Sequence, residues 1–204
     1  PLDEWCGEGV VVDISDCVSD FSLYTPEMLM KRADIRKGDI LIINTGYHRY
    51  GWDQKESDEV RYMVKHPGPS PDFADWALKM KIKWIGVDCG SADHPMNTIL
   101  RTWHPKLFLE AEAKLKHDYG VECWDDMFPP EEFYQIMHLK LFPKKLVHAE
   151  NIGGEIDKLK NKRTWIGLFP WRAIELESCI CRIVAFEFDG KGGAKQAAKK
   201  KGKK

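Results

Sequence analysis

The segment 144–154 carries the residues best suited to chemistry. It is a short apolar run that ends on an acid, Glu150, beside Asn151 and two glycines. A strand that delivers a carboxylate to its C-terminal edge and then turns on glycine is a common way to place a metal ligand or a base. His138 lies upstream on a segment with helical apolar spacing, so its imidazole and this carboxylate could meet. The pair suits a divalent metal, although two ligands are too few to hold one.

Both residues also have a simpler interpretation. Glu150 could be an exposed acid at a strand end or a partner at a helix N-cap, and His138 could be a histidine on the polar face of a helix. His148 competes for the ligand role, because strand alternation puts its side chain on the same face as that of Glu150. The residues themselves leave these alternatives open.

A second group of polar residues follows the apolar run 84–90: Asp88, Ser91, Asp93 and His94. Since α/β proteins often place substrate contacts after a strand, we expect Ser91 and His94 to bind substrate. The alternative is an ordinary turn rich in Asp and Ser. Trp52 and His66 could wall an aromatic substrate pocket, although a large aromatic residue on a loop more often anchors that loop to the body.

Other catalytic patterns are missing from the sequence. It has no GxSxG turn for a serine nucleophile, and none of its cysteines lies in a nucleophile motif. The glycines at 153 and 154 fit neither the P-loop nor the dinucleotide-binding pattern. These absences argue against a triad hydrolase and against a nucleotide-binding enzyme.

The elements that must position these residues alternate along the chain. Short apolar or β-branched runs predict strands at 9–15, 40–46, 84–90, 145–149, 165–170 and 181–188. Helices are predicted at 25–32, 72–80, 106–117 and 131–141, the first with Thr25 as N-cap and Pro26 at its first position. The segment 48–66 has no clean period and is predicted to be an irregular excursion, which could lie over the site. The mixture indicates an α/β layered domain.

Length and composition are those of an ordinary globular domain. The chain has 204 residues, of which 43% are hydrophobic and 31% are charged, with a formal net charge of −1. We expect one domain over 1–189, followed by a disordered lysine-rich tail over 190–204. The tail is most simply a solvated extension, and its alternative, a weak attraction to nucleic acid, is the less favoured.

The sequence also predicts a cellular setting. The six cysteines show no CxxC spacing and no density typical of a secreted scaffold, so free thiols in the cytoplasm are expected. No run is long and apolar enough for a membrane span, and no membrane partner is expected. Pro1 is not a natural start, so we expect a further segment upstream.

The order of five motifs resembles the cyclase family of metal-dependent hydrolases, which includes bacterial kynurenine formamidase, isatin hydrolase and trans-dienelactone hydrolase. The motifs are GVVVDIS at 9–15, IRKGDILIINTG at 35–46, HPGPSP at 66–71, IGVD at 85–88 and VHAEN at 147–151. The resemblance covers residues from about 9 to 188. It implies a swivelling β/β/α-type mixed-sheet fold with flanking helices, in a homo-oligomer, dimer or tetramer.

The resemblance also implies a chemistry. In the family, zinc or manganese activates water against an amide or a lactone, and a bound divalent ion lowers the pKa of water from about 15.7 to roughly 7. His138 and Glu150 resemble the late metal ligands of the family, since their interval matches that of formamidases. The HxGTHxDxxxH segment, which supplies the other ligands and the catalytic residues, is absent from the sequence, and we expect it upstream of Pro1. The stretch between Asp93 and His138 is longer than in formamidases.

Two functions follow as hypotheses. The first is a metal-dependent hydrolase that opens a small-molecule substrate by metal-activated water: an aryl formamide such as N-formylkynurenine, a cyclic amide or a lactone. The long stretch between Asp93 and His138 favours a member other than a strict formamidase. The second is a non-catalytic binding or assembly protein that keeps the cyclase-like fold. Neither substrate identity nor the choice between zinc and manganese can be predicted from the residues.

Overall fold

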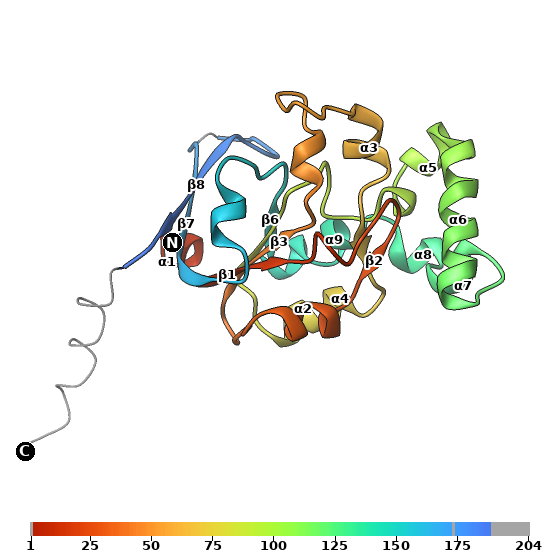
Figure 1. Ribbon diagram of the computed structural model, residues 1–204. Helices are drawn as coiled ribbons and strands as arrows, with labels where there is room; N and C mark the ends of the chain where they lie inside the picture. The colour runs from red at the N-terminus through yellow and green to blue at the C-terminus, as the bar shows by residue number, and fades with distance from the viewer. Residues whose placement is uncertain (1, 173, 189–204) are drawn as a thin grey trace, which may run out of the picture.

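A six-stranded mixed sheet forms the centre of the molecule in the computed structural model, which describes residues 2–172 and 174–188 (Figure 1). The sheet order is β6 (Val147–Ala149), β5 (Trp84–Val87), β3 (Ile40–Asn44), β1 (Cys6–Asp13), β7 (Arg163–Pro170) and β8 (Cys181–Phe186). The strands from β6 to β1 are parallel. β7 pairs antiparallel with β1, and β8 pairs antiparallel with β7. The predicted mixed α/β architecture is confirmed, and the predicted tail at 190–204 lies outside the described residues.

Both faces of the central strands are buried. Val10, Leu41 and Ile85 pair in register and belong to one core cluster. Their neighbours Val11 and Ile42 belong to a second cluster on the other side. The apolar runs that predicted these strands are continuous because a parallel sheet covered on both faces buries every residue in turn.

Helices cover the first face. They are α2 (Pro26–Arg32), α4 (Phe73–Lys79) and α9 (Ile136–Leu139), and each contributes side chains to the first core cluster. The predicted start of α2 is confirmed, because the Oγ1 atom of Thr25 accepts a hydrogen bond from the Met28 N–H at 3.1 Å. Such a cap stabilises a helix by about 1 kcal/mol. Leu29 and Phe73 are fully buried against the sheet.

The chain departs from the sequence prediction in two places. The segment 48–66 is not wholly irregular, because it contains η1 (Tyr47–Tyr50) and the helix α3 (Glu59–Val64). The prediction of a single helix at 131–141 is wrong. The segment contains two short helices, α8 (Pro130–Phe133) and α9, which are separated at Gln135. The φ of Gln135 is 48°, a left-handed conformation that cannot continue a helix.

A third cluster lies beyond the end of the sheet, and most of its buried residues belong to the long stretch between Asp93 and His138. It is built around Trp124, which is fully buried and stacks on Phe128. The helices around it are α5 (Leu100–Trp103), α6 (Pro105–Tyr119), α7 (Trp124–Met127) and α8. Figure 1 shows them grouped at the side of the sheet opposite β8. The remaining elements are α1 (Leu2–Trp5), β2 (Leu23–Tyr24), β4 (Gly68–Pro69), η2 (Pro95–Asn97), η3 (Phe142–Lys144) and η4 (Ile156–Leu159).

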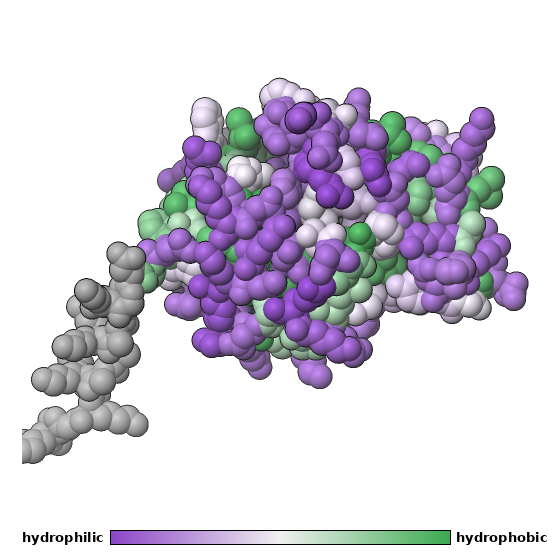
Figure 2. All heavy atoms as spheres, viewed as in Figure 1, coloured by the Kyte–Doolittle hydropathy of each residue, from purple (hydrophilic) through white to green (hydrophobic). Residues whose placement is uncertain are grey.

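Hydrophilic side chains cover most of the face drawn in Figure 2, and green hydrophobic patches interrupt them, some beside the end of the molecule that carries β7 and β8. Exposed large hydrophobic residues are frequent there: Phe169, Trp171, Ile174, Leu176, Ile180, Phe186 and Phe188. Among the described helices, none has the length and the apolar character needed to cross a membrane.

Candidate metal centre

The edge strand β6 places two of the candidate ligands. His148 pairs in register with Ile85, and residues paired across a sheet point to the same side. His148 therefore faces the side that α9 covers. Glu150 follows two residues later, just beyond the end of the strand. Both side chains thus reach the same space at the C-terminal edge of the sheet.

His138 reaches this space from α9. The preceding residues Ile136 and Met137 are buried in the first core cluster, which fixes the helix against the sheet. Asp93, fully buried, holds the end of the helix and the imidazole together. One of its carboxylate oxygens accepts the Met137 N–H at 2.9 Å, and the other lies 2.6 Å from Nδ1 of His138. The Nε2 atom of His138 is thereby directed to the cluster.

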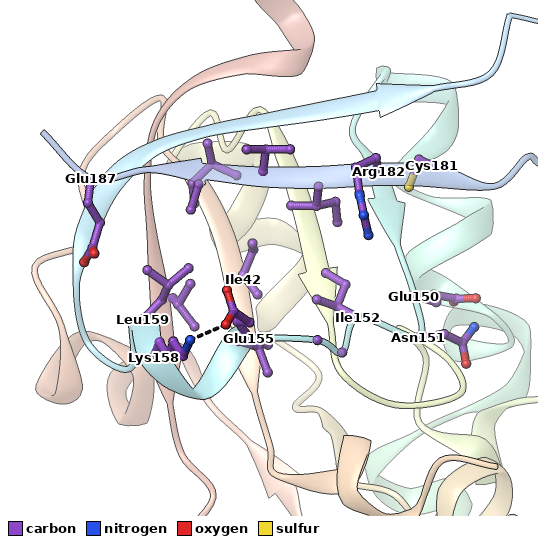
Figure 3. A pocket seen from close by; sticks show the side chains of 18 residues that line it. Ile42, Glu150, Asn151, Ile152, Glu155, Lys158, Leu159, Cys181, Arg182 and Glu187 are labelled. Carbon is purple, nitrogen blue, oxygen red and sulfur yellow. Dashed lines mark hydrogen bonds and ion pairs between the residues drawn. The ribbon is translucent and has the colours of Figure 1, made fainter. Parts of the chain in front are cut away.

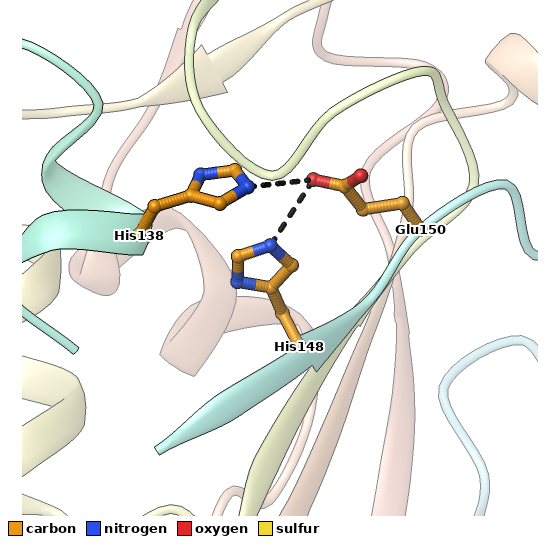
Figure 4. Close-up of side chains that lie close together, drawn as sticks. All are labelled: His138, His148 and Glu150. Carbon is orange, nitrogen blue, oxygen red and sulfur yellow. Dashed lines mark ion pairs between the residues drawn. The ribbon is translucent and has the colours of Figure 1, made fainter. Parts of the chain in front are cut away.

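Three ligand atoms converge (Figure 4). The Oε1 atom of Glu150 lies 3.2 Å from Nε2 of His148 and 4.0 Å from Nε2 of His138. One nitrogen from each histidine and one carboxylate oxygen all lie within 4.8 Å of one another. Among the described residues, this is the group of three or more Cys, His, Asp or Glu side chains that could hold a metal ion.

The Glu150 carboxylate is kept ionised. Its Oε1 atom accepts the Ala92 N–H at 2.8 Å and faces the Ser91 hydroxyl at 3.2 Å. Burial alone would raise the pKa of Glu150, but the hydrogen bonds from His148 and from the Ala92 N–H outweigh it and lower that pKa. The hydrogen bond to Asp93 raises the pKa of His138, and the charge of Glu150 adds to this.

These residues fit a divalent metal. Two imidazoles and a carboxylate are the donors that zinc and manganese accept. Asp93 supplies the outer carboxylate that metal-binding histidines usually carry on the other ring nitrogen. The Nδ1 atom of His148 is buried and has no hydrogen-bond partner among the described residues, and Nε2 is the ring nitrogen that faces Glu150.

The four predicted substrate residues lie in different parts of the structure. Ser91 lies against Glu150 at the centre itself. His94 is fully buried, stacks near Trp124, and has both ring nitrogens occupied by its own chain, at Phe21 O and Met96 N. Burial lowers the pKa of His94 to about 3, so it is neutral at physiological pH.

The other two predicted substrate residues lie apart. His66 is fully buried, with Nδ1 donating to Pro67 O at 2.9 Å and Nε2 without a partner among the described residues. Burial lowers the pKa of His66 to about 4. Trp52 is 90% exposed, so it does not anchor its loop to the body. It lines a cavity of about 380 Å³ together with His48, Tyr62 and the loop at 151–154. Substrate binding by these four residues stays a prediction.

A larger cavity, of about 660 Å³, begins at Glu150 and Asn151 and runs along the second face of the sheet (Figure 3). Its walls are mainly apolar and include Ile42, Ile152 and Leu159. Figure 3 shows the Glu150 carboxylate at one end, turned away from the apolar walls. The cavity has the size of a small-molecule site.

Comparison with protein families matches residues 1–94 to the family described as "Putative cyclase". Comparison with curated protein sequences found no match. Solved structures share the fold: a potential metal-dependent hydrolase with cyclase activity has a TM-score of 0.56, with 14% identity over 93% of this chain and 69% of its own.

Two isatin hydrolases are also similar. One, bound to the product analogue thioisatinate, has a TM-score of 0.62 and 17% identity. The other, isatin hydrolase A from Ralstonia solanacearum, has a TM-score of 0.61 and 16% identity. Each match covers 91% of this chain but 61% of the isatin hydrolase. Residues 1–94 thus match the cyclase family, and the chain shares the fold of these solved structures.

Proposed function

We propose that the protein is a metal-dependent hydrolase that cleaves an amide, a cyclic amide or a lactone, with an aryl formamide such as N-formylkynurenine among the candidate substrates. The observation that carries the proposal is the convergence of His138, His148 and Glu150. The match of residues 1–94 to the cyclase family supports it, as do the names of the similar structures, which include isatin hydrolases. Isatin contains a cyclic amide.

The residues of the chain have defined parts in this proposal. A zinc or manganese ion, when bound, supplies a Lewis acid that polarises the scissile carbonyl and makes water more acidic. Asp93 accepts a hydrogen bond from Nδ1 of His138, so in the neutral imidazole the proton lies on Nδ1 and the lone pair of Nε2 is directed to the centre. Ser91 and the Ala92 N–H hold the Glu150 carboxylate in place.

We further propose that the protein is a homo-oligomer. The exposed hydrophobic side chains at 169–188 support this, because monomeric proteins rarely expose contiguous apolar patches of large size. Light scattering at several protein concentrations measures the mass directly. A monomer at every concentration contradicts this proposal without affecting the metal centre.

The test of the hydrolase is metal content followed by turnover. Plasma mass spectrometry on the purified protein should find near-stoichiometric zinc or manganese, and Glu150→Ala should lose it. Glu132→Ala is the matched control, because Glu132 is an exposed glutamate on α8 that makes no ion pair in the described structure. The metal-loaded protein is then assayed with N-formylkynurenine, isatin and a dienelactone.

The outcomes separate the hypotheses. Hydrolysis of any of these substrates that disappears with a chelator and in Glu150→Ala supports the enzyme. Metal bound equally by wild type and Glu150→Ala contradicts the assigned centre. A protein that binds no metal, even after addition of zinc or manganese, contradicts the hydrolase and favours the binding protein.

A further inference from the structure

A second histidine, His48, lies at the C-terminal edge of the sheet in a hydrogen-bonded cluster that the metal centre does not use. It belongs to η1, directly after β3. Gly46 makes the turn between them with a φ of 78°, and a Cβ atom there would lie 2.8 Å from that of Ser15. Only glycine therefore fits the turn that places His48 beside Asp88, the first residue after β5.

Asp88 is a fully buried carboxylate. Its Oδ1 atom accepts the N–H and the hydroxyl of Thr45 at 2.8 and 2.6 Å, and its Oδ2 atom lies 2.8 Å from Nδ1 of His48. In residues 2–172 and 174–188, His48 is its ion-pair partner, and no lysine or arginine pairs with it. A buried carboxylate of this kind orients an imidazole and favours its protonated form.

The other ring nitrogen of His48 also faces a carboxylate. Its Nε2 atom lies 3.2 Å from Oδ2 of Asp157, which is half exposed on η4 and also pairs with Lys160 at 3.0 Å. Carboxylates only accept hydrogen bonds, so the doubly protonated imidazolium is the form that satisfies both contacts. The hydrogen bond to Asp88, more than any other contact, raises the pKa of His48, whereas burial opposes the rise.

His48 opens onto the cavity of about 380 Å³, which it shares with Trp52, Asp53, Tyr62 and the loop at 151–154. This loop connects the cavity to the metal centre, since Asn151 directly follows Glu150 and also lines the larger cavity. The N–H groups of Asn151 and Ile152 bond to Cys89 O and Val87 O, on either side of Asp88. These backbone hydrogen bonds therefore hold the two segments that carry Glu150 and Asp88 together. Tyr62 faces the same space, and burial, with the charges of Asp88 and Glu150 adding to it, raises the pKa of its hydroxyl.

We propose that His48 is the general acid of the hydrolysis, positioned by Asp88 and held by Asp157 until a leaving group takes the place of Asp157. This role rests on the proposed function. Water forms a bond to the carbonyl carbon, and the bond from that carbon to nitrogen or oxygen breaks. Nε2 of His48 gives its proton to the leaving atom, and the proton released by the attacking water restores the imidazolium. No other reactant is needed.

The test uses two formamides that differ in their leaving group, formanilide and its 4-nitro derivative, with the metal-loaded full chain. His48→Gln keeps an N–H donor toward Asp88 but cannot transfer a proton. We expect it to lose roughly 100-fold or more in kcat with formanilide, and much less with the 4-nitro compound, whose leaving group needs less protonation. His117→Ala is the control, because His117 is an exposed histidine that also bonds to an aspartate, at 2.8 Å, but lies on α6. It should match wild type.

Two further readouts separate proton transfer from a structural role. The rate for wild type should fall as pH rises above the pKa of His48, and His48→Gln should lack this alkaline limb. Asp157→Asn should move the limb to lower pH, because it removes one charge that favours the imidazolium. The metal content of His48→Gln should equal that of wild type.

The outcomes are distinct from those of the hydrolase test. Equal losses with both formamides, an unchanged alkaline limb in His48→Gln, or loss of metal from that variant would overturn the role of His48 and leave the hydrolase standing. A wild-type protein that hydrolyses neither formamide nor any substrate of the earlier panel overturns the hydrolase, and the role of His48 with it.

Discussion

Two histidine clusters lie at the same edge of the same sheet, yet they differ in what faces the Nε2 atom of the histidine. At the end of β6, Nε2 atoms of two imidazoles face the carboxylate of Glu150, and Asp93 bonds to the other nitrogen of His138. At the ends of β3 and β5, one imidazole, that of His48, lies between two carboxylates. The first arrangement directs ring nitrogens of two histidines at a common point, whereas the second favours a histidine that is protonated at both nitrogens.

The buried carboxylate is common to both clusters, and the difference lies in the group that faces Nε2. Asp93 and Asp88 are both fully buried, and each bonds to Nδ1 of a histidine. His138 meets a second imidazole and Glu150 at its Nε2 side, while His48 meets Asp157. The same Asp–His pair can therefore serve metal binding or proton transfer, and the group opposite Nε2 decides between them.

The largest expected effect comes from replacing the two buried aspartates in turn. In Asp93→Asn, the amide can donate to Nδ1 of His138, which favours the tautomer with a proton on Nε2 and blocks metal binding. We expect affinity for zinc to fall about 10–100-fold. Asp88→Asn should leave zinc affinity within about twofold of wild type. It should lower the unfolding midpoint, because the amide N–H of the new asparagine would face groups that donate hydrogen bonds to Asp88 in wild type. Competition with a chromogenic chelator measures both affinities. An equal loss in the two variants would show that the clusters are one unit.

A smaller effect is expected in the pH dependence of stability. Because the folded state raises the pKa of His48 above its ordinary value of 6.5, this residue stabilises the fold fully below that value, and the contribution is lost as pH rises through the raised pKa. A hydrogen bond to a charged group contributes roughly 1.5–3 kcal/mol. Wild type should therefore exceed His48→Gln in stability below about pH 6.5 and lose that advantage as pH rises through the raised pKa of His48. Urea unfolding at a series of pH values measures the difference, and a constant difference would contradict the prediction.

Sequence patterns predicted the buried strands better than the contacts between side chains. Continuous β-branched runs such as 9–15 and 40–46 indicated the buried strands, and the family resemblance selected His138 and Glu150, which the structure brings within 4.0 Å. The partner of His138 was beyond prediction, because Asp93 lies 45 positions away in the sequence and its role depends on how α9 packs.

The second cluster could not be predicted for a similar reason. Its members Asp88, His48 and Asp157 come from three separate strand ends or turns, and each looks like an ordinary polar loop residue in the sequence. The only usable signal was the position of Asp88 directly after an apolar run. The break at Gln135 also escaped prediction, since the apolar spacing continues through it and a left-handed residue leaves no mark on periodicity.

The smallest expected effect, that of Ser91→Ala, is compared with the loss of the hydroxyl group in the other cluster, that of Thr45. Thr45 is buried, and its Oγ1 atom lies 2.6 Å from Asp88, whereas Ser91 is partly exposed, and its Oγ atom lies 3.2 Å from Glu150. Thr45→Val should destabilise the fold by about 1.5–3 kcal/mol, the cost of a lost hydrogen bond to a buried charge. Ser91→Ala should cost only about 0.5 kcal/mol, because the Ala92 N–H at 2.8 Å still holds the carboxylate and water can reach the site. Urea unfolding of both variants measures these costs. A larger loss in Ser91→Ala than in Thr45→Val would mean that the metal centre, rather than the His48 cluster, is the more tightly hydrogen-bonded of the two, and that its carboxylate depends on the hydroxyl.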